Sequence, residues 1–248
     1  MVHHHNFLLN RVDPAALARM APHITVLHLE QGKVLAETHQ PVLKVYFPHS
    51  GIISNVVELI GGEAIETAMI GSDGAFGASQ AFDGRLSLNR VVMQVPGDAS
   101  VIESARLCEL ALQITPLRKL LVEYEQFLLA QVQQAVACNA VHDIHKRMCK
   151  WLLRMQRLVG NDLPLTQEFL AQMMGVQRTS VSTIAGSLQK LGMITYGRGH
   201  IHINDLELVR QHACECDAAI QSHYRRLFPA ARSDLLYQEP SSPHFFTR

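Results

Sequence analysis

Long hydrophobic runs are missing from this chain of 248 residues. No apolar stretch approaches the roughly 18–20 residues that a helix needs to span a bilayer, so we expect no membrane association. The first residues also lack the long apolar segment and small-residue cleavage site of a signal peptide. Hydrophobic residues make up 48% of the chain and charged residues 18%, which is typical of an ordinary globular protein and excludes extensive disorder.

Cysteine is also scarce, and its spacing is irregular. The chain has five cysteines, which are Cys108, Cys138, Cys149, Cys214 and Cys216. An odd number at scattered positions argues against a disulfide framework and favours free thiols in a cytoplasmic protein. The last two would need two further ligands to bind zinc. We therefore interpret them as free thiols, with redox sensing as the alternative.

Groups of residues that suggest catalysis are missing as well. We find no paired carboxylate, nucleophile–base set or Walker-type loop, so we expect no enzymatic activity. The histidines of the first fifty residues do not have the spacing of a cupin-like metal site, and the H-x-H pair of His200 and His202 lies in a predicted wing. We therefore predict no metal site, and a cupin-like metalloenzyme with an interaction module is a remote alternative.

The charge is distributed unevenly along the chain. Residues 1–145 carry 9 Lys/Arg and 14 Asp/Glu, a net charge of −5, whereas residues 146–210 carry 9 and 4, a net charge of +5. Residues 211–248 carry 4 of each and are neutral. A basic segment joined to an acidic one is the pattern of a separate nucleic-acid-binding module.

Residues 1–115 have the pattern of a β-rich domain. After a short helix over 7–22, glycine-punctuated runs predict strands at 24–29, 42–47, 51–59, 64–70, 89–95, 100–104 and 107–112. Many short strands at this spacing favour an antiparallel double-sheet roll, that is, a double-stranded β-helix or jelly roll. The fold class expected is therefore α+β, with this roll followed by helices.

A Gly-rich stretch over 71–95 interrupts the strand pattern. Its backbone N–H groups and arginines can form an anion pocket, and the alternative is a set of tight turns that glycine permits. The candidate effector pocket comprises Gly77, Ala78, Ser79, Arg85, Asn89, Arg90, Tyr124 and Phe127.

Residues 116–141 form the strongest predicted helix. Apolar residues recur at alternating spacings of four and three, which is the heptad pattern of a coiled coil. We predict a homodimer through this seam, whose members are Leu117, Leu121, Tyr124, Leu128, Gln131, Ala135 and Cys138. The alternative is a long core helix inside a monomer. A polar hinge is expected at 139–143, and a second helix at 145–158.

Residues 165–204 have the pattern of a winged helix-turn-helix within a domain at 142–217, with a tail at 218–248. With Gln167 as position one, Ala171 is the fifth residue and lets two helices cross closely, and Gly175 is the ninth and permits a left-handed turn. Val181 and Ile184 then pack the second helix on the first. A strand, a Gly-Arg-Gly turn and a second strand follow as the wing.

The outer face of the helix at 177–190 is expected to enter the major groove. Arginine can bond bidentately to guanine, and hydroxyl side chains reach bases or phosphates. The predicted DNA contacts are Thr166, Gln177, Arg178, Thr179, Ser180, Ser182, Thr183, Arg198 and His200.

On these motifs the chain resembles the Crp/Fnr family of bacterial transcription regulators over roughly residues 10–215. The resemblance is strongest in LPLTQEFLAQMMGVQRTSVSTIAGSLQKLGMITYGRGHIHI and continues into HACEC. It implies a dimer that reads a palindrome, an effector in the roll that repositions the DNA modules, and Arg178 as the base-reading arginine. The expected partners are double-stranded DNA and a second copy of the chain, and RNA polymerase and a small-molecule effector are further candidates.

Two departures from the family limit the choice of cofactor. Cyclic-nucleotide members carry G-E-[LI] and R-[ST]-A, whereas this chain has Gly77-Ala78-Ser79 and Asn89-Arg90-Val91. Oxygen-sensing members carry an N-terminal cysteine cluster, whereas no cysteine here precedes Cys108. We therefore expect neither classical cyclic-AMP binding nor an iron–sulfur cluster, and identify no other cofactor. The alternative is a regulator of this fold without an effector, controlled by redox of Cys138, Cys149 or the Cys214/Cys216 pair.

Overall fold

The computed structural model describes residues 5–82, 86–197 and 199–229. Short helices open the chain: η2 (Leu9–Arg11), α1 (Pro14–Met20) and η3 (Ala21–His23). Asp13 caps α1 by accepting a hydrogen bond from the Ala15 amide, and Pro14 suits the first turn because its missing N–H would have no partner there. In the described part of the chain, no helix combines the length and hydrophobicity needed to cross a membrane.

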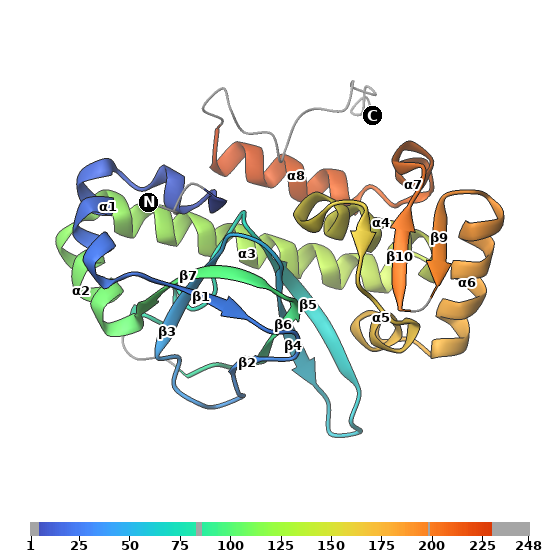
Figure 1. Cartoon of the computed structure of the whole chain (residues 1–248), viewed down its shortest axis with the longest axis horizontal. Helices are drawn as coiled ribbons and strands as arrows, with labels where there is room; N and C mark the ends of the chain where they lie inside the picture. Colours follow the sequence, from blue (N-terminus) through green and yellow to red (C-terminus); the bar gives the residue numbers. More distant parts are fainter. Residues whose placement is uncertain (1–4, 83–85, 198, 230–248) are drawn as a thin grey trace.

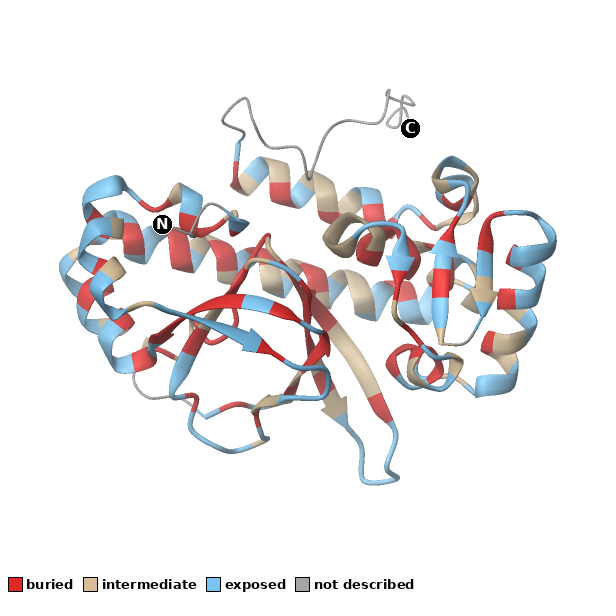
Figure 2. Ribbon diagram, viewed as in Figure 1, coloured by how far each residue is buried: buried red, intermediate tan, exposed pale blue. Residues whose placement is uncertain are grey.

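Two antiparallel sheets form the predicted β-roll. One sheet has the order β1-β7-β3, with β1 at Thr25–Leu29, β7 at Gly97–Glu103 and β3 at Lys44–Pro48. The other has the order β2-β6-β4-β5, with β2 at Val34–Ala36, β6 at Arg90–Val95, β4 at Ile52–Glu58 and β5 at Ala64–Ile70. Buried residues lie along β4, β5, β6 and β7, whereas most of β1 is exposed (Figure 2). A shared apolar core lies between the two sheets.

The strand predicted at 107–112 is wrong, because α2 (Ser104–Gln113) occupies this position. Its buried apolar residues are Leu107, Leu110 and Ala111, which are spaced three and four apart on one helix face. A six-residue apolar run fits a buried strand and a buried helix face equally well, so the sequence pattern alone does not distinguish them.

The long helix α3 (Thr115–Val141) crosses the molecule between the β-roll and α8 (Cys216–Leu227) (Figure 1). Only His142 and Asp143 separate α3 from α4 (Ile144–Val159). The link between the two helices is therefore two residues long, whereas the sequence predicted a five-residue hinge at 139–143. Asp143 caps α4 by accepting from the Lys146 amide. The sequence predicts a tail at 218–248, but residues 218–227 lie in α8. The rings of Tyr224 and Phe228 pack against Phe127 of α3.

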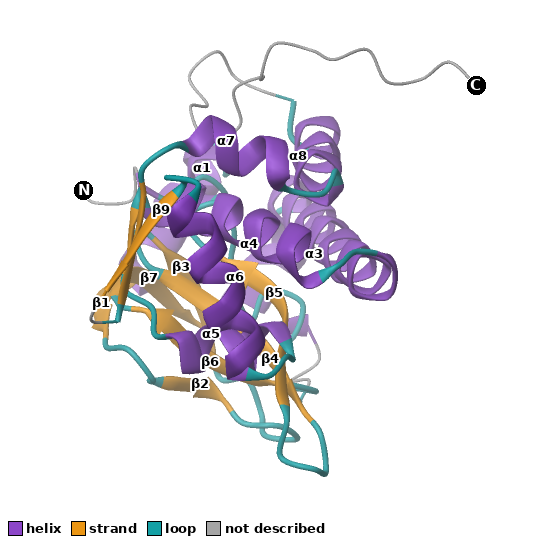
Figure 3. Cartoon of the chain, turned by 90° about the vertical axis from the view of Figure 1, so that its right-hand side faces the viewer, coloured by secondary structure: helices purple, strands orange, loops and turns teal. Residues whose placement is uncertain are grey.

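The C-terminal part has the predicted winged helix-turn-helix (Figure 3). It consists of β8 (Asp162–Leu163), α5 (Gln167–Met174), α6 (Arg178–Lys190), β9 (Ile194–Gly197), β10 (His200–Ile203) and α7 (Leu206–His212). The three strands form an antiparallel sheet in the order β8-β10-β9.

Candidate nucleic-acid interface

The turn between α5 and α6 has the geometry predicted from the sequence. Thr166 begins α5 by accepting a hydrogen bond from the Phe169 amide at 3.1 Å. Gly175 ends the helix in the left-handed conformation, at φ 62° and ψ 44°, which a side chain would disfavour. Ala171 and Val181 are buried where the two helices cross. This framework holds one face of α6 outward.

The outward face of α6 carries the predicted base-reading residues. Gln177, Arg178, Thr179 and Thr183 are all exposed. Gln177 occupies the N-cap position but makes no capping bond with its side chain. Its side chain therefore contributes little to the stability of the helix. The Arg178 guanidinium lies 3.7 Å from the carboxylate of Glu168, and both side chains are largely exposed. An ion pair of this kind contributes little stability, so the arginine is available to another partner.

Two other predicted contact residues make hydrogen bonds within this domain. The Ser182 hydroxyl donates to Gln167 Oε1 at 2.6 Å, which joins α6 to α5. The Thr183 hydroxyl donates to the Thr179 carbonyl at 3.0 Å, a local bond within α6. Ser180 is only partly exposed.

The wing packs beside α5. Tyr196 on β9 accepts a hydrogen bond from the Gln167 amide at 3.2 Å, which fixes the wing relative to the first helix. His200 begins β10 and is exposed. Arg198, predicted to contact phosphate at the wing tip, lies outside the described residues.

The residues predicted to line an effector pocket do not form one open site. Ala78, Tyr124 and Phe127 are at most 1% exposed and belong to an apolar core that includes residues of α8. Gly77 has a φ of +89°, and a Cβ there would lie 2.7 Å from the Lys44 carbonyl oxygen. The protein's own atoms fill the space around these four positions, and an effector pocket there stays a prediction.

The polar members of that predicted pocket bind carboxylates of the same chain. The Ser79 amide donates to Glu125 on α3 at 3.1 Å, and burial raises the pKa of Glu125. Arg90 pairs with Glu58 at 3.1 Å and Glu37 at 3.4 Å. The remaining predicted members are Asn89, which is partly exposed, and Arg85, which lies outside the described residues.

The face of α3 predicted as a dimer seam is covered within the protomer. Side chains at most 5% exposed are Leu117, Leu121, Tyr124, Gln131 and Cys138, and Leu128 and Ala135 are partly buried. Tyr124 of this face belongs to the same buried apolar cluster as Ile220 and Tyr224 of α8. Residues of the same chain cover much of this face, and a dimer seam along it stays a prediction. The heptad pattern marks an apolar helix face without saying what covers it.

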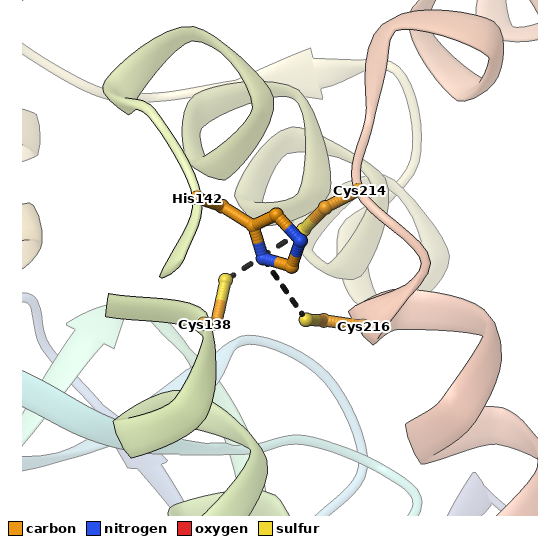
Figure 4. Close-up of side chains that lie close together, drawn as sticks. All are labelled: Cys138, His142, Cys214 and Cys216. Atoms are coloured by element: carbon orange, nitrogen blue, oxygen red, sulfur yellow. Dashed lines mark hydrogen bonds between the residues drawn. The ribbon is translucent and has the colours of Figure 1, made fainter. Parts of the chain in front are cut away.

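A cluster of sulfur and nitrogen ligands lies where α3, α4 and α8 meet (Figure 4). We call it the hinge cluster, and its members are Cys138, His142, Cys214 and Cys216. Their ligand atoms all lie within 4.8 Å of one another. Sequence reasoning noticed the Cys-x-Cys pair and named Cys138 separately, but it missed His142 and the grouping of all four. The signal was Cys138 and His142 at i and i+4, which share one face of a helix.

The remaining cysteine named for redox control lies apart from this cluster. Cys149 on α4 is fully buried in the apolar core that α4 shares with the winged helix-turn-helix, and burial raises its pKa to about 12. Because the thiolate is the reactive form of cysteine, this side chain stays a protonated, unreactive thiol.

Comparisons with known proteins agree with this geometry. Residues 146–211 match the Crp-like helix-turn-helix domain. No curated protein sequence matches the chain. Among solved structures, FixK2 from Bradyrhizobium japonicum has a TM-score of 0.66 at 15% identity over 77% of this chain and 98% of that one.

Two further solved structures have the same fold. A Crp/Fnr-family transcriptional regulator from Eubacterium rectale has a TM-score of 0.65 at 17% identity, over 84% of this chain and 98% of that one. Another from Thermus thermophilus has a TM-score of 0.63 at 19% identity, over 76% and 98%. At these identities the likeness establishes the fold alone.

Proposed function

We propose that the chain is a DNA-binding transcription regulator of the Crp/Fnr type that binds a palindromic DNA site as a homodimer, and its Crp-like helix-turn-helix domain supports this proposal. Each copy reads one half-site with the N-terminal half of α6. The observation that carries this proposal is the exposed set of Gln177, Arg178 and Thr179 at the start of that helix. These side chains contribute little to the fold, and the start of the second helix is the end that enters a major groove.

The residues at this end of α6 have different roles in the proposed complex. Arg178 leaves Glu168 and bonds bidentately to a guanine, because its guanidinium is exposed and weakly paired. Thr179 and Gln177 reach neighbouring bases or phosphates. His200 on the wing contacts the backbone beside the groove and contributes affinity more than sequence preference.

The homodimer is proposed to form on a different face of α3 from the one the sequence predicted. Val122, Leu129 and Val136 are 50%, 57% and 66% exposed and lie seven residues apart. A spacing of seven places them in one row on a helix, on the side opposite the buried face. A β-branched residue at two of these three positions favours a two-stranded coiled coil. Pairing of two such rows would place the two copies of α6 for adjacent half-sites.

Selection from random DNA duplexes tests this proposal. We expect an inverted repeat with half-site centres about 34–36 Å apart, one helical turn, or a multiple of that distance. Affinity should fall linearly with salt on a double-logarithmic plot as counterions are released. Enrichment of no site, or of a single half-site bound by a monomer, would contradict the proposal.

A second candidate concerns the signal. The contacts of Ser79 and Arg90 support control that does not act through a nucleotide phosphate at this part of the roll, since both groups already bind carboxylates. Thermal-shift measurements with cyclic mononucleotides should show no stabilisation. A shift that rises with nucleotide concentration and is lost in Arg90→Ala would instead support an effector in the roll.

A further inference from the structure

The four members of the hinge cluster come from three separate segments. Cys138 is in the last turn of α3, His142 follows that helix directly, and Cys214 and Cys216 lie where the chain enters α8. The cysteines are at most 6% exposed, and the His142 side chain is 14% exposed. The side chains point toward one another (Figure 4). A buried group of four convergent ligands requires an explanation beyond ordinary packing.

Two distances between the ligand atoms match the edges of a tetrahedral zinc site, and all four ligand atoms lie within 4.8 Å of one another. Cys138 Sγ lies 3.6 Å from Cys214 Sγ, and Cys216 Sγ lies 3.6 Å from His142 Nδ1. Zinc bonds of about 2.3 Å to sulfur and about 2.05 Å to nitrogen give tetrahedral edges of about 3.8 Å for S···S and about 3.6 Å for S···N. A disulfide would need its two sulfurs about 2.05 Å apart.

The groups around the cluster also suit a metal. His142 Nε2 lies 3.2 Å from a carboxylate oxygen of Glu215, so this nitrogen carries the proton and Nδ1 is left to bind. Metal-binding histidines usually donate their other ring nitrogen to such a carboxylate, which fixes the tautomer. Gln134 donates to Cys216 Sγ at 3.1 Å, the kind of bond that supports a thiolate ligand.

We propose that the hinge cluster binds one zinc ion through its three sulfurs and the Nδ1 of its histidine. Binding releases the three thiol protons to solvent and leaves a ZnS₃N site with a net charge of −1. The N-terminus of α8 begins at Cys216 and partly offsets this charge. Zinc suits this ligand set because three cysteines and one histidine complete its four-coordinate structural sites.

The position of the site gives it a structural role. The DNA-binding domain spans residues 146–211, and the ligands lie just before it and just after it in the chain. One ion would therefore link the residues that flank both ends of that domain to Cys138 at the end of α3. None of the ligands lies on α6 or on the wing, so metal binding can be measured whether or not the DNA-binding proposal holds.

The first test uses the full-length wild-type protein. After purification with zinc and dialysis, mass spectrometry of the metal should give one zinc per chain. Cobalt added to the demetallated protein should give the thiolate-to-metal charge-transfer band of a tetrahedral sulfur site. Only trace zinc and no such band would overturn the proposal. So would an intact mass lower by two hydrogens, which would reveal a disulfide.

Variants test which residues hold the metal. Cys214→Ser should lose the stoichiometric zinc, and Cys108→Ser is the matched control because its thiol lies outside the cluster on α2 and is only partly buried. Glu215 is 77% exposed, and Glu215→Gln should still bind one zinc per chain. Its zinc affinity should fall about 10–100-fold, because the carboxylate no longer orients the His142 ring. Equal metal loss in Cys214→Ser and Cys108→Ser would overturn the assignment.

Thermal unfolding provides a readout that does not depend on any variant folding well. With free zinc at about a thousand times Kd, mass action should raise Tm by about 10 °C over the demetallated protein. A strong chelator should reverse this shift. A Tm that is the same with zinc and with chelator would overturn the proposal.

Discussion

Arg154 of α4 and Asp73 of the β-roll form an ion pair, with 2.7 Å between Nη1 and Oδ2 and both side chains almost fully buried. The other arm of the guanidinium donates to the Met69 carbonyl at 3.0 Å. Tyr224 of α8 adds a hydroxyl bond to the Asp73 carbonyl at 3.4 Å. The roll, the DNA-binding domain and α8 therefore meet at one buried charge pair. We expect the stability of the fold to depend on the presence of both charges.

Removing one member of this pair should destabilise the protein strongly. Asp73→Asn leaves the Arg154 charge buried without its counter-ion, which costs about 3–5 kcal/mol in free energy of unfolding. Glu103→Gln is the control, because its pair with Lys44 is 3.9 Å long and exposed and should contribute less than about 1 kcal/mol. Urea denaturation measures both, and equal losses would show that burial of the pair does not matter.

The two proposed kinds of DNA contact should separate on mutation. Arg178→Ala should cost about 1–3 kcal/mol of binding free energy and relax the preference at one base position. His200→Ala should weaken all sequences about equally, since a wing contact to the backbone carries no base information. Binding to a panel of single-base variants of the selected site measures both effects. Identical profiles would contradict this division of roles.

The exposed row on α3 can be tested independently of DNA. Leu129→Lys places a charge at the centre of the proposed dimer contact, and analytical ultracentrifugation should show a shift to monomer. Leu112→Lys is the matched control, since Leu112 is 65% exposed on α2, outside the row. A dimer that survives Leu129→Lys but not Leu112→Lys would place the interface elsewhere.

Stability should depend on pH through Glu66, which lies between the roll and α4. Burial raises its pKa from 4.5 to about 7, and it accepts a bond from Trp151 Nε1 at 2.9 Å. Between these values the folded chain holds a proton that the unfolded chain has lost, so stability falls as pH rises from about 4.5 to about 7. Lys150 and Arg154, the nearby cations, oppose this shift.

Glu66→Gln should flatten that pH dependence because glutamine does not titrate. Urea denaturation at pH 5 and pH 7.5 would compare the variant with wild type, and Glu109→Gln, at an exposed surface carboxylate, serves as control. If Glu66→Gln loses as much stability over this range as wild type, another group is responsible.

Local signals were sufficient for the winged helix-turn-helix. Gly175 is predicted as the ninth residue of the motif, and it takes the left-handed backbone that glycine favours. Thr166 directly precedes α5, and its side chain caps that helix. Such features involve residues within a few positions of one another, so their chemistry is visible in the sequence.

Only the tertiary structure decided what covers each apolar face and which distant ligands meet. The heptad pattern on α3 was real, but α8 packs on one part of that face from about 100 residues later, because burial depends on the final fold and not on periodicity. Cys138 and Cys214 are 76 residues apart in sequence and 3.6 Å apart in space. Helix spacing could suggest Cys138 with His142, and Cys-x-Cys could suggest a pair, but only the packing of α8 against α3 brings the two halves into one site.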